Sequence, residues 1–298
     1  MLFVNAFAVV RGHPQPDISC ITKWLKDVAV ISEHHKPKRP DTVEFHARAV
    51  QRVISTVRER LDDSISLKEM AALAYMSRFH FNRTFRQITG LPPRRFLSAL
   101  RVQSATRMLL DTDHSVTDIC LDVGYNSLGT FIRRFSEVLG ISPMRLRSMR
   151  RSPARNLLQK AEANPQAGSA ATEPTVVGRI QVPVSFSGPI FIGLFATAIP
   201  EGAPVACAIR YSPGSFQIAG APRGHHYLFA VGLPWPDRVS DYFRHDFAPR
   251  GGGELVCVDK DIVECGEICL RPAMPTDPPI LVNLPVLLSK ALSMRKVA

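Results

Sequence analysis

The pattern of apolar and polar residues divides this chain into a helical first half and a strand-rich second half. Between residues 43 and 150, apolar side chains recur at spacings of three and four, as they do on one face of an α-helix. The first such stripe contains Phe45, Ala49, Val53, Ile54, Val57 and Leu61. After residue 175, short apolar runs lie between Gly and Pro, and some of them alternate with polar residues, which indicates strands.

Local signals place the ends of the predicted helices. Ser66 and Glu69 have the spacing of a capping box, in which each side chain bonds to the backbone N–H of the other residue. A new helix is predicted to start at Ser77 and to stop at Gly90, because Ser is a good N-cap and Gly a good C-cap. Pro92 and Pro93 then open a long helix that extends to about residue 110.

The same layout occurs a second time. Ser115 is predicted to cap a short helix, Gly124 to make a turn, and Asn126 or Ser127 to cap a helix that ends at Gly140. The two copies share a basic residue, then Phe, Gly and Pro at fixed spacing: Arg83, Phe85, Gly90 and Pro93 in the first, and Arg133, Phe135, Gly140 and Pro143 in the second. We therefore predict two helix-turn-helix units joined by the helix over residues 94–110. A major groove admits one such helix, and successive grooves lie roughly 34 Å apart.

The second half is predicted to be an antiparallel β-sandwich. The strand candidates are residues 179–186, 189–198, 205–211, 215–220, 226–233, 254–259 and 262–270. Strict alternation over Ile180–Phe186 requires one buried face, whereas the continuous run Ile190–Ala196 requires burial on both faces, and two packed sheets satisfy both demands. The fold class is thus α plus β in two domains. We expect an N-terminal extension at 1–40, the helical domain at 41–150, a linker at 151–174 and the sandwich at 175–298.

Charge changes this picture in favour of an anionic partner. The net charge is +11 and the pI about 9.7, and residues 41–150 alone carry 17 basic and 11 acidic side chains. Such an excess favours nucleic acid first and an acidic membrane surface second. The six cysteines are scattered, as expected for reduced thiols in the cytoplasm. Since no apolar run reaches the roughly 18 residues of a membrane span, we expect no membrane association.

These residues carry a family resemblance. Residues 45–150 resemble the DNA-binding domain of AraC-type (arabinose-regulator-like) transcription factors, through the paired frames of Ser, Phe, Arg, Gly and Pro given above. The resemblance implies sequence-specific binding to double-stranded DNA and places base-contacting side chains on the outer face of each second helix. Carried over, the base contacts are Phe79, Asn82, Arg83, Thr130 and Arg133, and the phosphate contacts are Arg78, Arg86 and Arg134.

The chain departs from the family pattern in two ways. Leu128 and Gly129 stand where polar, base-reaching side chains are expected, so the second unit is expected to read DNA weakly or to position the first. The DNA-binding part also comes first, whereas in the family it usually ends the chain. The stretch from Gly214 resembles the transthyretin-like or carboxypeptidase-regulatory-like β-sandwich, at the level of fold alone.

The expected function is transcriptional regulation without catalysis. The β domain is expected to sense a small-molecule effector, to form a homodimer or to contact a protein such as RNA polymerase. Two alternatives stay open: an enzyme that acts on a small molecule through the β domain, and a repair-type methyl acceptor, although no Pro-Cys-His motif is present. We predict no catalytic residue, no cofactor and no metal, because Cys257, Cys265 and Cys269 lack the spacing of a zinc site.

Overall fold

The computed structural model describes residues 40–63, 65–150, 174–183, 186–235, 237–243 and 248–282. Within these ranges the first part is helical and the second consists of strands. The helices are α2 (Pro40–Glu59), α3 (Leu67–Leu73), α4 (Arg78–Thr89), α5 (Pro93–Asp111), α6 (Val116–Asp122), α7 (Leu128–Leu139) and α8 (Pro143–Met149). Nearly all of the expected extension at 1–40 and of the expected linker at 151–174 lies outside the described residues.

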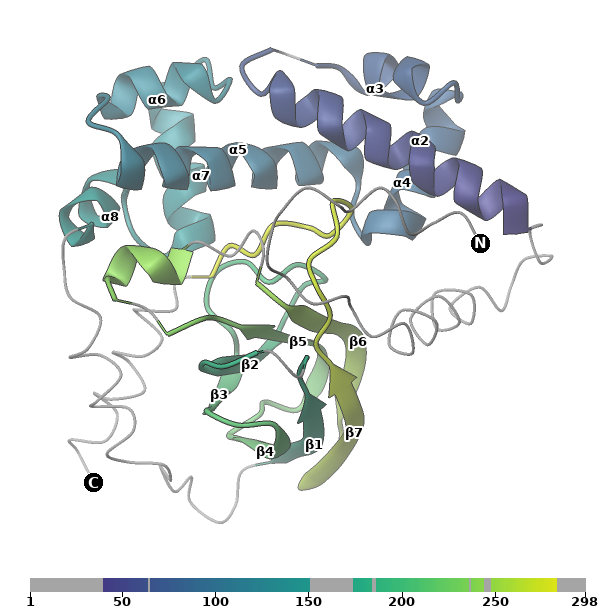
Figure 1. Ribbon diagram of the computed structural model, residues 1–298, viewed down its shortest axis with the longest axis vertical. Helices are drawn as coiled ribbons and strands as arrows, with labels where there is room; N and C mark the ends of the chain where they lie inside the picture. Colours follow the sequence, from purple (N-terminus) through teal and green to yellow (C-terminus); the bar gives the residue numbers. More distant parts are fainter. Residues whose placement is uncertain are drawn as a thin grey trace.

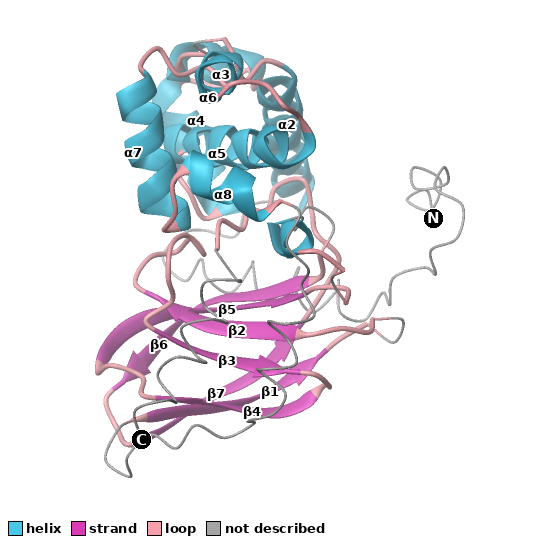
Figure 2. Ribbon diagram, turned by 90° about the vertical axis from the view of Figure 1, so that its left-hand side faces the viewer, coloured by secondary structure: helices cyan, strands magenta, loops and turns pink. Residues whose placement is uncertain are grey.

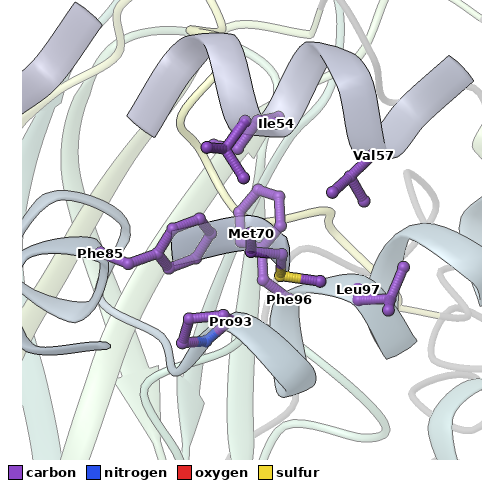
Figure 3. A pocket seen from close by; sticks show the side chains of 8 residues that line it. Ile54, Val57, Met70, Phe85, Pro93, Phe96 and Leu97 are labelled. Carbon is purple, nitrogen blue, oxygen red and sulfur yellow. The ribbon is translucent and has the colours of Figure 1, made fainter. Parts of the chain in front are cut away.

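Helices α2, α3 and α4 form the first unit around one apolar core. Its fully buried residues include Val53, Ile54, Met70, Phe81 and Phe85. Figure 3 shows Met70 and Phe85 facing Ile54 and Val57 of α2, with Phe96 and Leu97 of α5 closing the other side. The space left between them is about 10 Å³, about the minimum for one water molecule, so this hollow is core packing rather than a ligand site. Phe45, expected in the buried stripe, is 58% exposed.

Helix α5 connects the two units because it is apolar on two faces. Phe96 and Leu100 pack into the first core, whereas Ala99, Val102 and Leu109 pack into the second. The second unit consists of α6, α7 and α8, and its core contains Ile119, Phe131, Phe135 and Leu146 among other residues. Figure 1 shows α5 running across the molecule between the two units.

Arg101 of α5 ties the end of α2 to the second unit. Its Nε and Nη2 donate to the carbonyls of Leu61 (3.1 Å) and Asp63 (3.0 Å). Its guanidinium also lies 5.8 Å from the ring centroid of Tyr125. The neighbouring Gly124 has φ +83°, and a Cβ there would lie 2.3 Å from the Leu61 carbonyl oxygen. Glycine is therefore required at this position both by conformation and by space.

The second part of the chain forms two stacked sheets. The strands are β1 (Thr175–Gln181), β2 (Ile190–Phe195), β3 (Ala206–Arg210), β4 (Gly214–Ala219), β5 (Gly224–Gly232), β6 (Arg250–Val258) and β7 (Ile262–Cys269). One sheet has the order β4-β1-β7 and the other β3-β2-β5-β6. All pairs are antiparallel except β1 with β7, which is parallel. The two-sheet, mainly antiparallel architecture confirms the predicted fold class.

Two strand predictions need correction in detail. The strand expected over 179–186 runs from Thr175 to Gln181, because Pro183 cannot donate a ladder hydrogen bond and the pairing with β4 begins at Thr175. The strand expected over 189–198 ends at Phe195. Beyond it, residues 196–200 lead towards the helical part.

The four-stranded sheet lies between the other sheet and the helices (Figure 2). Strand β2 shows why its sequence is continuously apolar: Ile190, Ile192 and Leu194 pack into the sandwich core. Phe191 and Phe195 pack towards the helices. The face that the sequence required to be buried is therefore covered by the helical domain.

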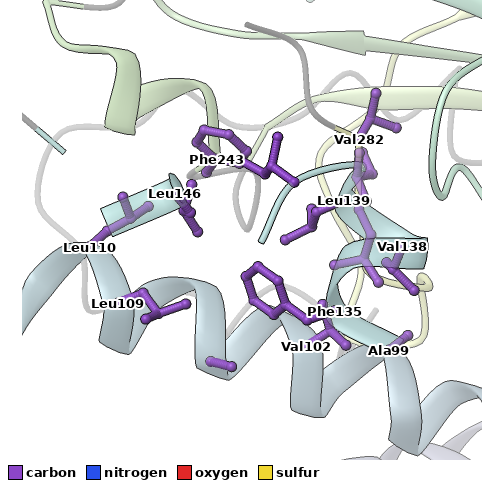
Figure 4. Packing of buried hydrophobic residues seen from close by; sticks show 14 of the residues in the cluster. Ala99, Val102, Leu109, Leu110, Phe135, Val138, Leu139, Leu146, Phe243 and Val282 are labelled. Carbon is purple, nitrogen blue, oxygen red and sulfur yellow. The ribbon is translucent and has the colours of Figure 1, made fainter. Parts of the chain in front are cut away.

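Segments from the β domain complete this interdomain core. Tyr242 and Phe243 of the short 3-10 helix η1 (Val239–Phe243), together with Ile280, Leu281 and Val282, belong to the same cluster as α5, α7 and α8. Figure 4 shows Phe243 beside Leu110 and Leu146, and Val282 beside Leu139. Tyr242 is fully buried, and its hydroxyl has no hydrogen-bond partner among the described residues. The two domains thus share one apolar core.

Candidate nucleic-acid interface

Helix α4 is held so that one face is buried and the other faces outwards. The Ser77 hydroxyl accepts from the His80 backbone N–H at its start, and Gly90 with φ +76° ends it in the left-handed conformation. Phe81 and Phe85 anchor the inner face and are almost completely buried. Because core residues recur every three to four positions, the side chains between them are directed away from the core.

All five residues predicted on α4 are exposed. These are Arg78, Phe79, Asn82, Arg83 and Arg86. Phe79 is 87% exposed, a high fraction for a large aromatic side chain. Three guanidinium groups and one carboxamide share this surface, and these are the groups that pair with guanine, phosphate and adenine.

Helix α7 is built in the same way but presents different chemistry. Ser127, one of the two expected caps, accepts from the Thr130 N–H, and Gly140 with φ +69° ends the helix. Thr130 and Arg133 are exposed as predicted. The Arg133 Nε lies 3.9 Å from a carboxylate oxygen of Glu137, so this helix carries an acid beside its outward cation.

Residues fifty positions apart make the asymmetry clear. Phe79, Asn82 and Arg86 on α4 correspond to Gly129, Ile132 and Ser136 on α7. Among these outward-facing positions, only Arg83 and Arg133 are the same residue type in both copies. The outward face of α7 therefore offers fewer hydrogen-bond donors than that of α4.

Arg134 lies apart from this surface and faces the β domain. Its Nε donates to the Ser98 hydroxyl at 3.3 Å, and its Nη2 donates to Glu201 at 3.0 Å. Its side chain is 27% exposed. The physical reason is its position on α7, one step round the helix from Arg133, where α5 and the loop after β2 converge. The structure thus gives Arg134 an interdomain contact where a phosphate contact was expected.

Two further features of this surface were missed by sequence reasoning. Tyr75, in the turn before α4, is 83% exposed and has φ +55°, in the left-handed region that disfavours residues with a side chain. The Nε2 atoms of His80 on α4 and His46 on α2 lie 3.4 Å apart. The turn after α3 and the turn after α6 are 49 positions apart, so Tyr75 stands where the second copy has Gly124, which also has a positive φ. This correspondence is the sequence signal for the left-handed turn at Tyr75.

Helix α3 is fixed by the predicted capping box. The Glu69 N–H donates to the Ser66 hydroxyl at 3.2 Å, and the Ser66 N–H donates to the Glu69 carboxylate at 2.7 Å. These hydrogen bonds from Ser66 hold the pKa of Glu69 below its ordinary value. At any pH above the ordinary pKa of a glutamate, the Glu69 carboxylate is therefore charged and the cap stays intact.

Comparison with known proteins identifies this region. Residues 70–149 match the helix-turn-helix domain family. Residues 70–149 thus form a helix-turn-helix domain. The matched region begins within α3 and ends with α8, so it includes α4, the connecting helix α5 and the whole second unit.

The relatives match about a third of this chain or less. An uncharacterized HTH-type transcriptional regulator of Haemophilus influenzae is 41% identical over 81 residues, which are 27% of each chain. The MmsAB operon regulatory protein of Pseudomonas aeruginosa is 36% identical, over 29% of this chain and 28% of its own. The transcriptional activator AarP of Providencia stuartii is 29% identical, over 34% of this chain and 74% of its own. The chain covers only 27–28% of the length of the first two of these relatives.

Two solved structures are also similar to part of this chain. The DNA-binding domain of AdpA, solved in complex with a target DNA, is 30% identical, with 40% of this chain and 98% of that domain covered and a TM-score of 0.33. A transcriptional regulator with an AraC-type domain from Chromobacterium violaceum is 24% identical, with 36% and 95% covered and a TM-score of 0.34.

The β domain shows no comparable site among the described residues. No group of three or more His, Cys, Asp or Glu side chains that could hold a metal is found there. The Cys265 thiol donates to the Val177 carbonyl at 3.2 Å, and burial raises its pKa to about 11. His226 is buried, with Nε2 2.8 Å from the Pro222 carbonyl oxygen. In the described part of the chain, no helix combines the length and the apolar character needed to cross a bilayer.

Proposed function

We propose that this chain is a sequence-specific DNA-binding transcriptional regulator that reads two adjacent major-groove segments of double-stranded DNA. The observation that carries the proposal is the duplicated helix-turn-helix in an AraC-type domain, with polar and basic side chains on the outward face of α4. Arg83, Asn82 and Phe79 are the proposed base contacts of the first unit, and Thr130 and Arg133 those of the second. Arg78 and Arg86 are the proposed phosphate contacts.

The first unit supplies most of the base reading in this proposal. Its outward face carries three arginines and one asparagine, whereas that of α7 carries Arg133 beside Glu137. A carboxylate near the phosphate backbone is repelled, so α7 binds DNA with less electrostatic gain. The second unit then mainly adds affinity and fixes the register of the first.

We propose that the β domain is the regulatory part of the chain and has no catalytic activity. We also propose that the chain acts in the cytoplasm. In this proposal the β domain binds a small-molecule effector, a second copy of the chain or RNA polymerase. The alternative of a repair-type methyl acceptor is supported by one relative, the bifunctional transcriptional activator and DNA repair enzyme AdaA of Bacillus subtilis, which is 27% identical over 47% of its length. Against a thiolate nucleophile at Cys120 or Cys265, burial raises the pKa of both thiols.

Selection of duplexes from a random pool by the full chain tests this function. At a fixed salt concentration, we expect enrichment of one motif with a strongly read segment and a weakly read segment about one helical turn away. Retention of every sequence alike, with an affinity that depends only on salt, would leave a basic protein that binds polyanions and would refute the proposal.

A further inference from the structure

One loop of the β domain reaches both helix-turn-helix units. It comprises Ile199–Gly202, between β2 and β3, and forms a β-bridge with the segment around Leu281. The Leu281 N–H donates to the Pro200 carbonyl at 2.9 Å, and the Gly202 N–H lies 3.2 Å from the Leu281 carbonyl oxygen. The loop is therefore anchored within its own domain before it meets the helices.

Three consecutive contacts connect this loop to the helical domain. Ile199 is 1% exposed and packs into the core of the first unit. The Gly202 N–H donates to the Val138 carbonyl at 2.7 Å, and thus satisfies a carbonyl at the end of α7. Between them, the Glu201 carboxylate binds two arginines at once.

The two arginines lie on different helices. One Glu201 oxygen accepts from Arg95 at 2.7 Å, and the other accepts from Arg134 at 3.0 Å. Arg95 lies in the first turn of α5, immediately after the first unit, whereas Arg134 lies on α7. The Glu201 side chain is only 13% exposed. Without the carboxylate, two guanidinium cations would face each other at this junction, and their repulsion would favour separation of the helices.

We propose that Glu201 is a positioning residue that fixes α7 relative to the first unit and so couples the β domain to DNA binding in two successive grooves. This inference rests on the proposed function. A protein that contacts two grooves at once binds more tightly when its two reading helices already have the required orientation, because less conformational freedom is lost on binding. The gain is absent when the duplex engages one unit only.

The experiment compares two duplexes and two variants in the full chain. The duplexes are the selected operator and a half operator in which the segment read by the second unit is scrambled. Glu201→Ala is expected to weaken operator binding on the order of tenfold and half-operator binding less than about twofold. Glu264→Ala, which removes the same charge from an exposed position on β7, is expected to leave both affinities unchanged.

Two further measurements separate positioning from charge. The dependence of binding on salt is expected to be the same for Glu201→Ala and wild type, since the number of phosphate contacts is unchanged. Arg134→Ala added to Glu201→Ala is expected to cause little further loss, because the two residues act through one contact. Glu201→Gln, which keeps the shape and loses the charge, replaces the alanine variant if the latter does not fold.

Three outcomes overturn the inference. Equal weakening on both duplexes would mean that Glu201 serves only general stability, and tighter binding with a steeper salt dependence would mean that Glu201 masks cations that bind phosphate. If the wild type selects no duplex, the proposed function fails instead. Hydrogen exchange of residues 199–202 then still tests whether Glu201 fixes this loop against the helices. Unchanged protection of these amides in Glu201→Ala would contradict that role.

Discussion

Replacing Arg83 by alanine is expected to weaken binding to the selected operator by about 1–3 kcal/mol and to relax preference at one base position. Arg83 is exposed on the outward face of α4, between the buried anchors Phe81 and Phe85. A guanidinium held there by a rigid helix can pair with a guanine edge through two hydrogen bonds. Titration of wild type and variant against operator and scrambled duplexes at one salt concentration measures the loss.

The matched control is Arg133→Ala at the corresponding position of α7. Glu137 lies 3.9 Å from the Arg133 guanidinium, so removal of this arginine is expected to cost less than removal of Arg83. Equal losses for Arg83→Ala on operator and scrambled duplexes would make Arg83 a phosphate contact. A larger loss for Arg133→Ala than for Arg83→Ala would reverse the proposed roles of the two units.

Gly124→Ala is expected to lower the free energy of unfolding by about 2–5 kcal/mol, from about 1–2 kcal/mol of left-handed strain and about 1–3 kcal/mol of overpacking. The new Cβ would lie 2.3 Å from the Leu61 carbonyl oxygen and 2.6 Å from Nη2 of Arg101. Backbone at the end of α2 would have to move, and the hydrogen bonds of Arg101 to this segment would be strained. Denaturant unfolding followed by circular dichroism measures the change.

Gly140→Ala separates strain from clash. Gly140 also has a positive φ, +69°, but a Cβ there meets no atom within 4 Å. Gly140→Ala is therefore expected to lower the free energy of unfolding only by the left-handed strain, about 1–2 kcal/mol. If both variants lose the same free energy of unfolding, the close packing of Leu61 and Arg101 around Gly124 does not add to the cost of Gly124→Ala.

The helical half was predictable because its local signals agree with its tertiary structure. The caps at Ser66, Ser77 and Ser115, and the stops at Gly90 and Gly140, act within a few residues and need no knowledge of distant contacts. The family resemblance also placed the outward residues of α4. Tyr75 escaped because a non-glycine residue in a left-handed turn carries no sequence signal of its own.

The β domain and the interdomain contacts were less accessible. The strand around Ile180 was displaced because alternation continues past Gln181, whereas hydrogen bonding to β4 does not. The parallel pairing of β1 with β7 joins segments more than eighty residues apart, and periodicity cannot specify such a pair. Glu201 and Arg134 are distant in sequence too, so the partner of Arg134 emerged only from the packed domains.

Genome-wide mapping of bound sites, in cells that carry the full chain or its Arg83→Ala variant, tests the central claim most directly. The account predicts discrete sites that share one motif with two segments about one helical turn apart, roughly 34 Å. It also predicts that the variant loses preference at one position of the first segment. Even coverage of the genome by both proteins, with no shared motif, would contradict sequence-specific regulation by this chain.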